Sequence, residues 1–78
     1  MNAKIYITLK PGVLDPQGKA VKHSLETLGF NEVADVRVGK FIELKLGDIA
    51  RSEAEKKVKE MCEKLLANTV IESYKIEL

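Results

Sequence analysis

Residues 33–46, VADVRVGKFIELKL, decide the fold because apolar and polar residues alternate along them without interruption. Side chains of a β-strand point alternately to opposite faces, so the two sets line different surfaces. One parity holds Ala34, Val36, Val38, Ile42, Leu44 and Leu46, and the other holds Asp35, Arg37, Phe41, Glu43 and Lys45. A two-residue hairpin at Gly39 and Lys40 would bring charged residues onto the apolar face. That hairpin is therefore ruled out.

Two connections remain for this stretch. In one, Gly39, Lys40 and Phe41 form a three-residue loop, so that the strand folds back and Val38 lies opposite Ile42. In the other, the stretch is a single long strand, bent at Gly39. We favour the long strand, whose ~14 residues exceed the usual 5–6. Its far half would leave the core of its own chain, and a second copy of the chain is the obvious source of cover.

Length and composition set the outer limits. Seventy-eight residues, 45% apolar and 32% charged, predict a single domain over residues 1–78 that is marginal alone and gains from oligomerisation. The formal charge of +1 gives no net field to attract nucleic acid or an anionic membrane. No apolar run approaches a membrane span and no signal-peptide core is visible, so we expect a cytoplasmic protein.

The first half of the chain reads as a strand and then a helix. Residues 3–10 alternate like a half-buried strand, and Pro11 and Gly12 end it. In the helix that follows, Asp15 suits the N-cap, Pro16 the first position and Gly29 the left-handed C′ position. The helix carries a single apolar stripe of Val21, Leu25 and Leu28, and Gly18 in its first turn suggests close packing.

The second half reads as a helix and then a strand. A helix over residues 51–68 has a possible capping box at Ser52 and Glu55, or a start one turn earlier at Asp48, and Asn68 suits a left-handed C-cap. Its apolar stripe is Ala54, Val58, Met61, Cys62 and Leu65, and its expected ion pairs are Glu53 with Lys57, Glu55 with Lys59 and Glu60 with Lys64. A last strand over residues 70–78 places Val70, Tyr74, Ile76 and Leu78 on one face.

This order predicts an α+β fold: a two-layer sandwich in which an antiparallel sheet carries both helices on one face. If residues 33–46 fold back, the chain is a ferredoxin-like β-α-β-β-α-β unit. If they do not, two chains exchange halves of their long strands in a homodimer and build two such units.

The residues themselves predict no catalytic or metal site. One histidine and one cysteine are too few for a zinc site; we expect His23 on the surface and Cys62 in the core. Nucleotide-binding glycine motifs are absent. Tyr6 and Phe41 lie on the polar face of their strands, where aromatic residues of RNA-binding sheets stack bases, but charged residues share that face. We expect this face to meet another protein or a second copy of the chain.

The sequence resembles the PurS family of phosphoribosylformylglycinamidine (FGAM) synthase subunits. The resemblance rests on VLDPQGKAV at residues 13–21, EVADVRVGKFIEL at 32–44 and MCEKLLANTVIE at 61–72, in the family's order and spacing. It implies a homodimer of ferredoxin-like subdomains in de novo purine biosynthesis, bridging a PurL-type synthetase and a PurQ-type glutaminase. The resemblance also implies that the complex converts formylglycinamide ribonucleotide, glutamine and ATP to formylglycinamidine ribonucleotide. The small subunit is expected to have no cofactor of its own, because ATP and Mg²⁺ are used by the synthetase.

Partner contacts are expected where these motifs carry polar residues or glycine. The candidates are Asp15, Pro16, Gln17, Gly18, Arg37, Gly39 and Lys40, with Tyr6 and Phe41 as candidates for the dimer face. Gln17, Arg37 and Lys40 rank first, because no local feature of a helix or turn explains them. The alternative functions are a free-standing ferredoxin-like domain that senses a small molecule, which would bind its ligand without partners, and an RNA-binding module, whose affinity would fall with salt.

Overall fold

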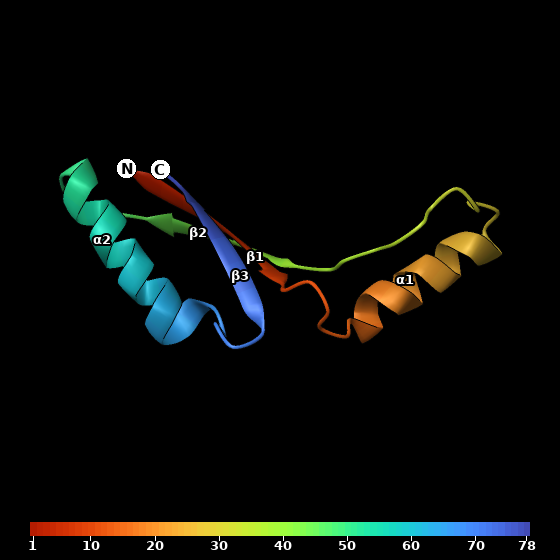
Figure 1. Cartoon of the computed structure of the whole chain (residues 1–78). Helices are drawn as coiled ribbons and strands as arrows, with labels where there is room; N and C mark the ends of the chain where they lie inside the picture. The colour runs from red at the N-terminus through yellow and green to blue at the C-terminus, as the bar shows by residue number, and fades with distance from the viewer.

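A computed structural model describes residues 1–78 and confirms the α+β class (Figure 1). The elements in chain order are β1 (Asn2–Leu9), α1 (Pro16–Thr27), β2 (Lys40–Lys45), α2 (Arg51–Met61), the π-helical turn η1 (Cys62–Leu66) and β3 (Glu72–Glu77). The three strands form an antiparallel sheet in the order β2-β1-β3. Both termini lie at the same end of this sheet (Figure 1).

The core lies between the central strand β1 and α2. Ile5 of β1 is directly opposite Ile42 of β2 and Ile76 of β3, so the alternation predicted for all three strands brings their apolar residues onto one face. Val58 and Cys62 cover that face and are fully buried. Only nine of the 78 residues are buried, however, which makes this a small core for a chain of this length.

The ends of α1 confirm the sequence prediction. Asp15 is the N-cap, with its carboxylate accepting from the Gly18 amide, and Pro16 begins the helix. Gly29 has a φ of +95°, and its amide donates to Glu26 while the Phe30 amide donates to Leu25 at 2.9 Å. These two bonds form a Schellman motif, which satisfies the last carbonyl groups of the helix.

The ends of the second helix differ from the prediction. It begins at Arg51 with Ala50 as N-cap and no side-chain cap, so neither the capping box of Ser52 nor a start at Asp48 is formed. At the other end the chain continues into η1, and Asn68 does not adopt a left-handed conformation. The turn after η1 is held instead by the side chain of Asn68, which accepts from the Val70 amide at 3.2 Å.

Two of the three expected ion pairs along this helix are present. Glu53 with Lys57 and Glu60 with Lys64 are formed, but Glu55 pairs with Arg51, one turn earlier, at 3.8 Å. The apolar stripe is only partly buried, because Met61 is 38% and Leu65 is 81% exposed. A π-turn places more residues in each turn than an α-helix does, and this rotates Leu65 away from the sheet. Val70 lies outside β3 and is exposed, so its predicted place on the strand's apolar face was wrong.

The stretch 33–46 does not fold back on itself. Residues 33–39 run from the α1 region to the sheet without pairing, and only Lys40–Lys45 pairs, with β1. The three-residue loop and the pairing of Val38 with Ile42 are therefore wrong, and the favoured long strand is formed in this chain only over Lys40–Lys45. α1 stands far from the sheet at the end of an arm (Figure 1). Hence a single chain has only α2 on the sheet face, and the second helix position is empty. The radius of gyration of 16.0 Å, against about 11.5 Å expected for a compact domain of this length, records the same extension.

Candidate functional site: a crossing point and two uncovered apolar surfaces

Most of the predicted contact residues meet where the arm crosses the sheet. There the extended segment 36–39 passes the first turn of α1 on one side and the end of β1 on the other. Asp15, Gln17, Gly39 and Lys40 line one groove of about 350 Å³ together with Ile7, Leu9, Val38 and Glu72. The Gly18 amide donates to Asp15 in this groove, and Pro16 begins the helix beside it. Arg37 precedes Val38 of the lining and bonds instead to the carbonyl groups of Lys10 and Val13. The sequence motifs at 13–21 and 32–44 are therefore parts of one location.

Asp15 links the two segments of the crossing. Its Oδ1 accepts from the Gly18 amide at 2.8 Å and its Oδ2 accepts from the Val38 amide at 2.9 Å. The residue is only 5% exposed. These hydrogen bonds, that of Val38 foremost, and the positive charge of Arg37 hold the pKa of the Asp15 carboxyl below its usual value. The carboxylate therefore both caps α1 and holds the segment around Val38 against the start of the helix.

Arg37 also has an intrachain role, which its ranking as a free contact residue did not foresee. Its Nη1 donates to the Val13 carbonyl and its Nη2 to the Lys10 carbonyl, both at 3.0 Å. The two carbonyl groups belong to the ends of a type II turn, closed by the Val13 amide on Lys10 and made possible by Gly12 at φ +85°. A planar guanidinium can hold two such acceptors at once.

Two glycines allow the backbones to approach at the crossing. A Cβ on Gly18 would overlap with the backbone oxygen of Val36, and one on Gly39 would overlap with that of Ile7. The close packing expected at Gly18 is confirmed. Gly39 is needed for the same reason and has no left-handed conformation.

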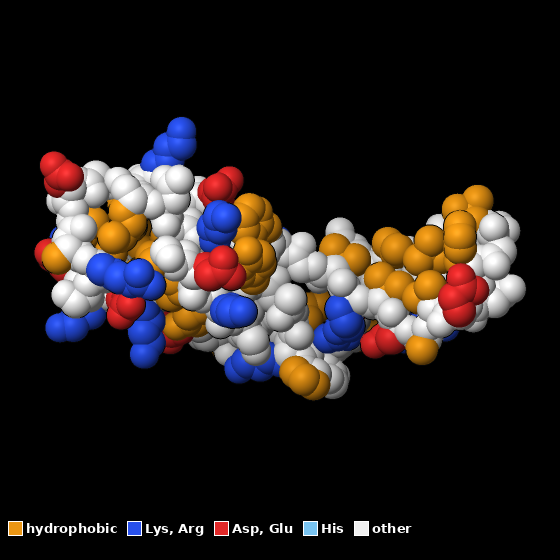
Figure 2. Space-filling model, turned by 90° about the horizontal axis from the view of Figure 1, so that it is seen from above, with side chains coloured by type: hydrophobic (Ala, Val, Ile, Leu, Met, Phe, Trp, Pro, Cys, Tyr) orange, Lys and Arg blue, Asp and Glu red, His pale blue; other side chains and the backbone are white.

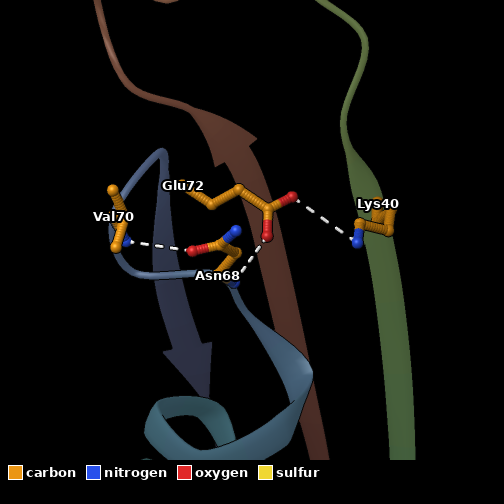
Figure 3. A network of polar contacts seen from close by, with 4 residues as sticks. All are labelled: Lys40, Asn68, Val70 and Glu72. Carbon is orange, nitrogen blue, oxygen red and sulfur yellow. Dashed lines mark hydrogen bonds and ion pairs between the residues drawn. The ribbon is translucent and has the colours of Figure 1, made fainter.

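Gln17 and Lys40 remain available at this groove. Gln17 is exposed, and the Lys40 side chain keeps 60% of its surface free while its Nζ lies 3.5 Å from Glu72 Oε2. Figure 3 shows that the other carboxylate oxygen of Glu72 accepts from the backbone amide of Asn68, at 2.7 Å. Sequence reasoning missed Glu72. The available signal was parity: Lys40 and Glu72 each share the parity of the apolar residues on their strand. Two opposite charges are therefore expected on the same face of the sheet, on the two strands that flank β1.

Tyr6 and Phe41 form a cross-strand aromatic pair. They are directly opposite each other in the register of β1 and β2, and their ring centroids are 5.1 Å apart. Their parity is opposite to that of Ile5 and Ile42, so they lie on the sheet face away from α2, 39% and 53% exposed.

Two apolar surfaces are left uncovered by the chain itself. The first is on the α1 arm, where Figure 2 shows hydrophobic side chains gathered over the helix. Its exposed members are Leu14, Val21, Leu28 and Phe30. The second is a groove of about 410 Å³ along α2, lined by Met61 and Leu65 and rimmed by charged residues. We call these the arm surface and the α2 groove.

No group of three His, Cys, Asp or Glu side chains lies close enough to hold a metal ion. His23 is exposed, and Cys62 is in the core, where burial raises the pKa of its thiol. None of the helices is both long and apolar enough to cross a membrane.

Together these features define a small α+β protein that leaves apolar surfaces uncovered, as a subunit of a larger assembly does. Residues 2–78 match the family model PurS, phosphoribosylformylglycinamidine (FGAM) synthase. The chain therefore belongs to the PurS family.

Individual relatives are similar in sequence over nearly all of this chain. The FGAM synthase subunit PurS of Bacillus subtilis is 56% identical over 96% of this chain and 88% of its own, and that of Synechocystis is 48% identical over 99% and 77%. Among solved structures, B. subtilis PurS superposes with a TM-score of 0.87 at 55% identity, covering 97% of this chain and 94% of that one. A chain of PurLQS from Thermotoga maritima gives 0.83 at 30% identity, with 99% and 96% covered.

Proposed function

We propose that this chain is the small accessory subunit of FGAM synthase in de novo purine biosynthesis, and that it works in the cytoplasm. The full-length family match, with the same fold in PurS structures, is the observation that carries the proposal. Its partners are a PurL-type synthetase, which uses ATP and Mg²⁺, and a PurQ-type glutaminase. The existence of PurLQS from T. maritima, with a chain of this fold, supports that assembly.

The contribution of the subunit is positional. Ammonia released from glutamine has to reach the synthetase before water protonates it or it diffuses away. A subunit that fixes the two active sites relative to each other raises the coupled rate without a reacting group of its own. The groove residues Gln17 and Lys40 are the contacts we propose for a partner, because they are exposed while Asp15, Gly18, Arg37 and Gly39 are engaged within the chain.

Reconstitution tests this role. The synthetase and glutaminase from the same source are assayed with and without this chain, with glutamine or with an ammonium salt as nitrogen donor. Omitting the chain is expected to reduce glutamine-driven FGAM formation at least about tenfold, equivalent to about 1.4 kcal/mol, and to leave ammonium-driven formation unchanged. Equal loss with both donors, or turnover by the isolated chain, would contradict the proposal. Gln17→Ala and Lys40→Ala, compared with Lys19→Ala on the same helix, test the contact surface.

The subunit acts as a homodimer in this proposal, because the two halves of the chain complement each other. The outer edge of β2 has no neighbour, and residues 33–38 have no strand to pair with. In a two-fold arrangement, residues 33–38 of one chain pair with β2 of the second copy, and the reverse pairing follows from the symmetry. Even-numbered residues must then lie opposite even-numbered residues, so that Val36 and Val38 join Ile42 and Leu44 of the second copy on the apolar face.

The helices fit the same arrangement. The flank of α2 that carries Arg51, Glu55 and Lys59 lies over β3, beside Ile76 and Leu78. The α2 groove is lined by other residues of this helical segment, among them Met61 and Leu65, and we place the arm of the second copy there. The arm surface of that copy covers the α2 groove and Ile42 and Leu44 of β2, which are only partly buried in the single chain. Each half of the dimer then has two helices on one face of a four-stranded sheet.

A further inference from the structure

The direction of the arm is set only at the crossing point. No residue of α1 belongs to the core cluster or packs against it, and Figure 1 shows α1 separated from the sheet. The arm therefore has no helix-to-sheet packing within its own chain to hold its angle. Two segments of the chain connect the arm to the sheet: the turn at residues 10–13 and the extended segment 36–39.

Asp15 and Arg37 tie these two connections together. An N-cap needs a single side-chain oxygen, yet both oxygens of Asp15 are used, and the second holds the amide of Val38, 23 residues away. Arg37 holds two carbonyl groups, 24 and 27 residues away. The glycines at the crossing allow the backbones to touch while these bonds form. We call Asp15 and Arg37, with the backbone groups that they bind, the clamp.

Exchange of an arm between identical chains does not by itself produce a dimer. If the arm reaches the second copy at the angle that a two-fold axis requires, the second arm returns and the assembly closes. At other angles each arm reaches a new copy, and open chains grow. The angle thus decides between a closed dimer and higher oligomers.

We propose that the clamp fixes the arm at the angle that closes the dimer, and so suppresses open oligomers and sets the distance between the two halves. This inference rests on the homodimer of the proposed function. It assigns to Asp15 and Arg37 a positioning role inside the subunit, distinct from any contact with the synthetase or glutaminase.

The test uses variants that spare the helix cap. Asp15→Ser keeps one oxygen for the Gly18 amide and cannot also reach Val38. Arg37→Lys keeps the charge but has one ammonium nitrogen in place of the planar fork of Nη1 and Nη2, so it loses the paired geometry that holds the two carbonyl groups. The exposed Asp48→Ser serves as control, because it removes a carboxylate that makes no hydrogen bond and lies outside both the clamp and residues 33–38. Molar mass is measured by light scattering over a dilution series, with circular dichroism to verify folding and hydrogen exchange to follow the Val38 amide.

Each clamp variant is expected to stay folded, to exchange the Val38 amide at least about tenfold faster, and to form a several-fold larger fraction of species above the dimer. The double variant is expected to show the largest fraction, and Asp48→Ser to match the parent chain. A double variant that remains a dimer at all concentrations would overturn the clamp, whatever the parent chain does with its partners. Should Asp15→Ser unfold α1, Arg37→Lys gives the answer alone, because the cap is untouched. If the parent chain is monomeric, the proposed dimer is wrong. This result is obtained with the parent chain alone and so is distinguished from failure of the clamp.

Discussion

Removing one side chain from the arm surface should weaken the dimer by a predictable amount. Leu28 is 72% exposed in the single chain, so a second copy can still bury most of it. Full burial of a leucine side chain contributes about 1.5–3 kcal/mol, and the exposed share is therefore about 1–2 kcal/mol per copy. A two-fold dimer loses this twice in Leu28→Ala, about 2–4 kcal/mol in total. Since each 1.4 kcal/mol is a factor of ten, the dimer Kd should rise about 30- to 700-fold.

The measurement is sedimentation or light scattering over a dilution series that spans dissociation of both the parent chain and the variant. Leu28 is the C-cap residue and its amide makes the hydrogen bonds there, so the substitution should not weaken α1, and circular dichroism checks that it does not. Val70→Ala is the matched control: Val70 is 81% exposed but lies in the turn before β3, away from both apolar surfaces. The reasoning is refuted if Leu28→Ala dissociates at the same concentration as the parent chain, or if Val70→Ala weakens the dimer as much.

Three further predictions concern single residues. Gly39→Ala should lower the free energy of unfolding by about 1–3 kcal/mol in urea titrations, because its Cβ would overlap with a backbone oxygen of β1, whereas Gly47→Ala, with open space around it, should stay within about 0.5 kcal/mol of the parent. The hydrogen bond from Tyr74 to Glu63, at 2.7 Å, foremost, together with desolvation and nearby negative charge, raises the pKa of the phenol from 10.0 to about 12. The stabilising contribution is therefore complete below pH 10 and lost as the pH rises towards 12, and ultraviolet titration should place the pKa of Tyr74 lower in Glu63→Gln. Cys62 should react with a thiol reagent only after unfolding, because it is fully buried and its thiol has a raised pKa, and fast alkylation of the native chain would show that α2 is not seated as described.

The face on which each strand side chain lies was predictable, because that depends on parity alone. Alternation placed Ile5, Ile42 and Ile76 on the apolar faces of their strands, but which residues pair across the sheet was not predicted. The start and end of α1 were equally predictable, since proline and glycine at Pro16 and Gly29 restrict the backbone locally. These signals act over a few residues and need no knowledge of the rest of the chain.

The second helix shows where local signals fail. The pattern at Ser52 fits a capping box, but the chain starts the helix one residue before it, and the π-turn that follows Met61 has no sequence signature that separates it from a continuing α-helix. The exposure of Leu65 follows from that turn. The long-range hydrogen bonds of Asp15 and Arg37 were also hidden, because their partners are 23 to 27 residues away and meet only when the arm crosses the sheet.

The unchanged parity across Gly39 and Lys40 does not by itself explain why the chain does not fold into a compact monomer. A hairpin at this point could satisfy the same faces within one chain, so the apolar pattern alone is neutral between a folded-back and an exchanged arrangement. The contacts at the crossing, in contrast, favour the exchanged arrangement. Gly39 lies against Ile7 and Gly18 against Val36, and the clamp bonds keep segment 36–39 in line with β2. A tight loop at residues 39–41 would pull Val38 away from Asp15 and leave that carboxylate in a largely buried position without its second donor. The contacts that hold the arm out therefore also select exchange over closure within a single chain, and an accessory subunit with two equal halves follows from them.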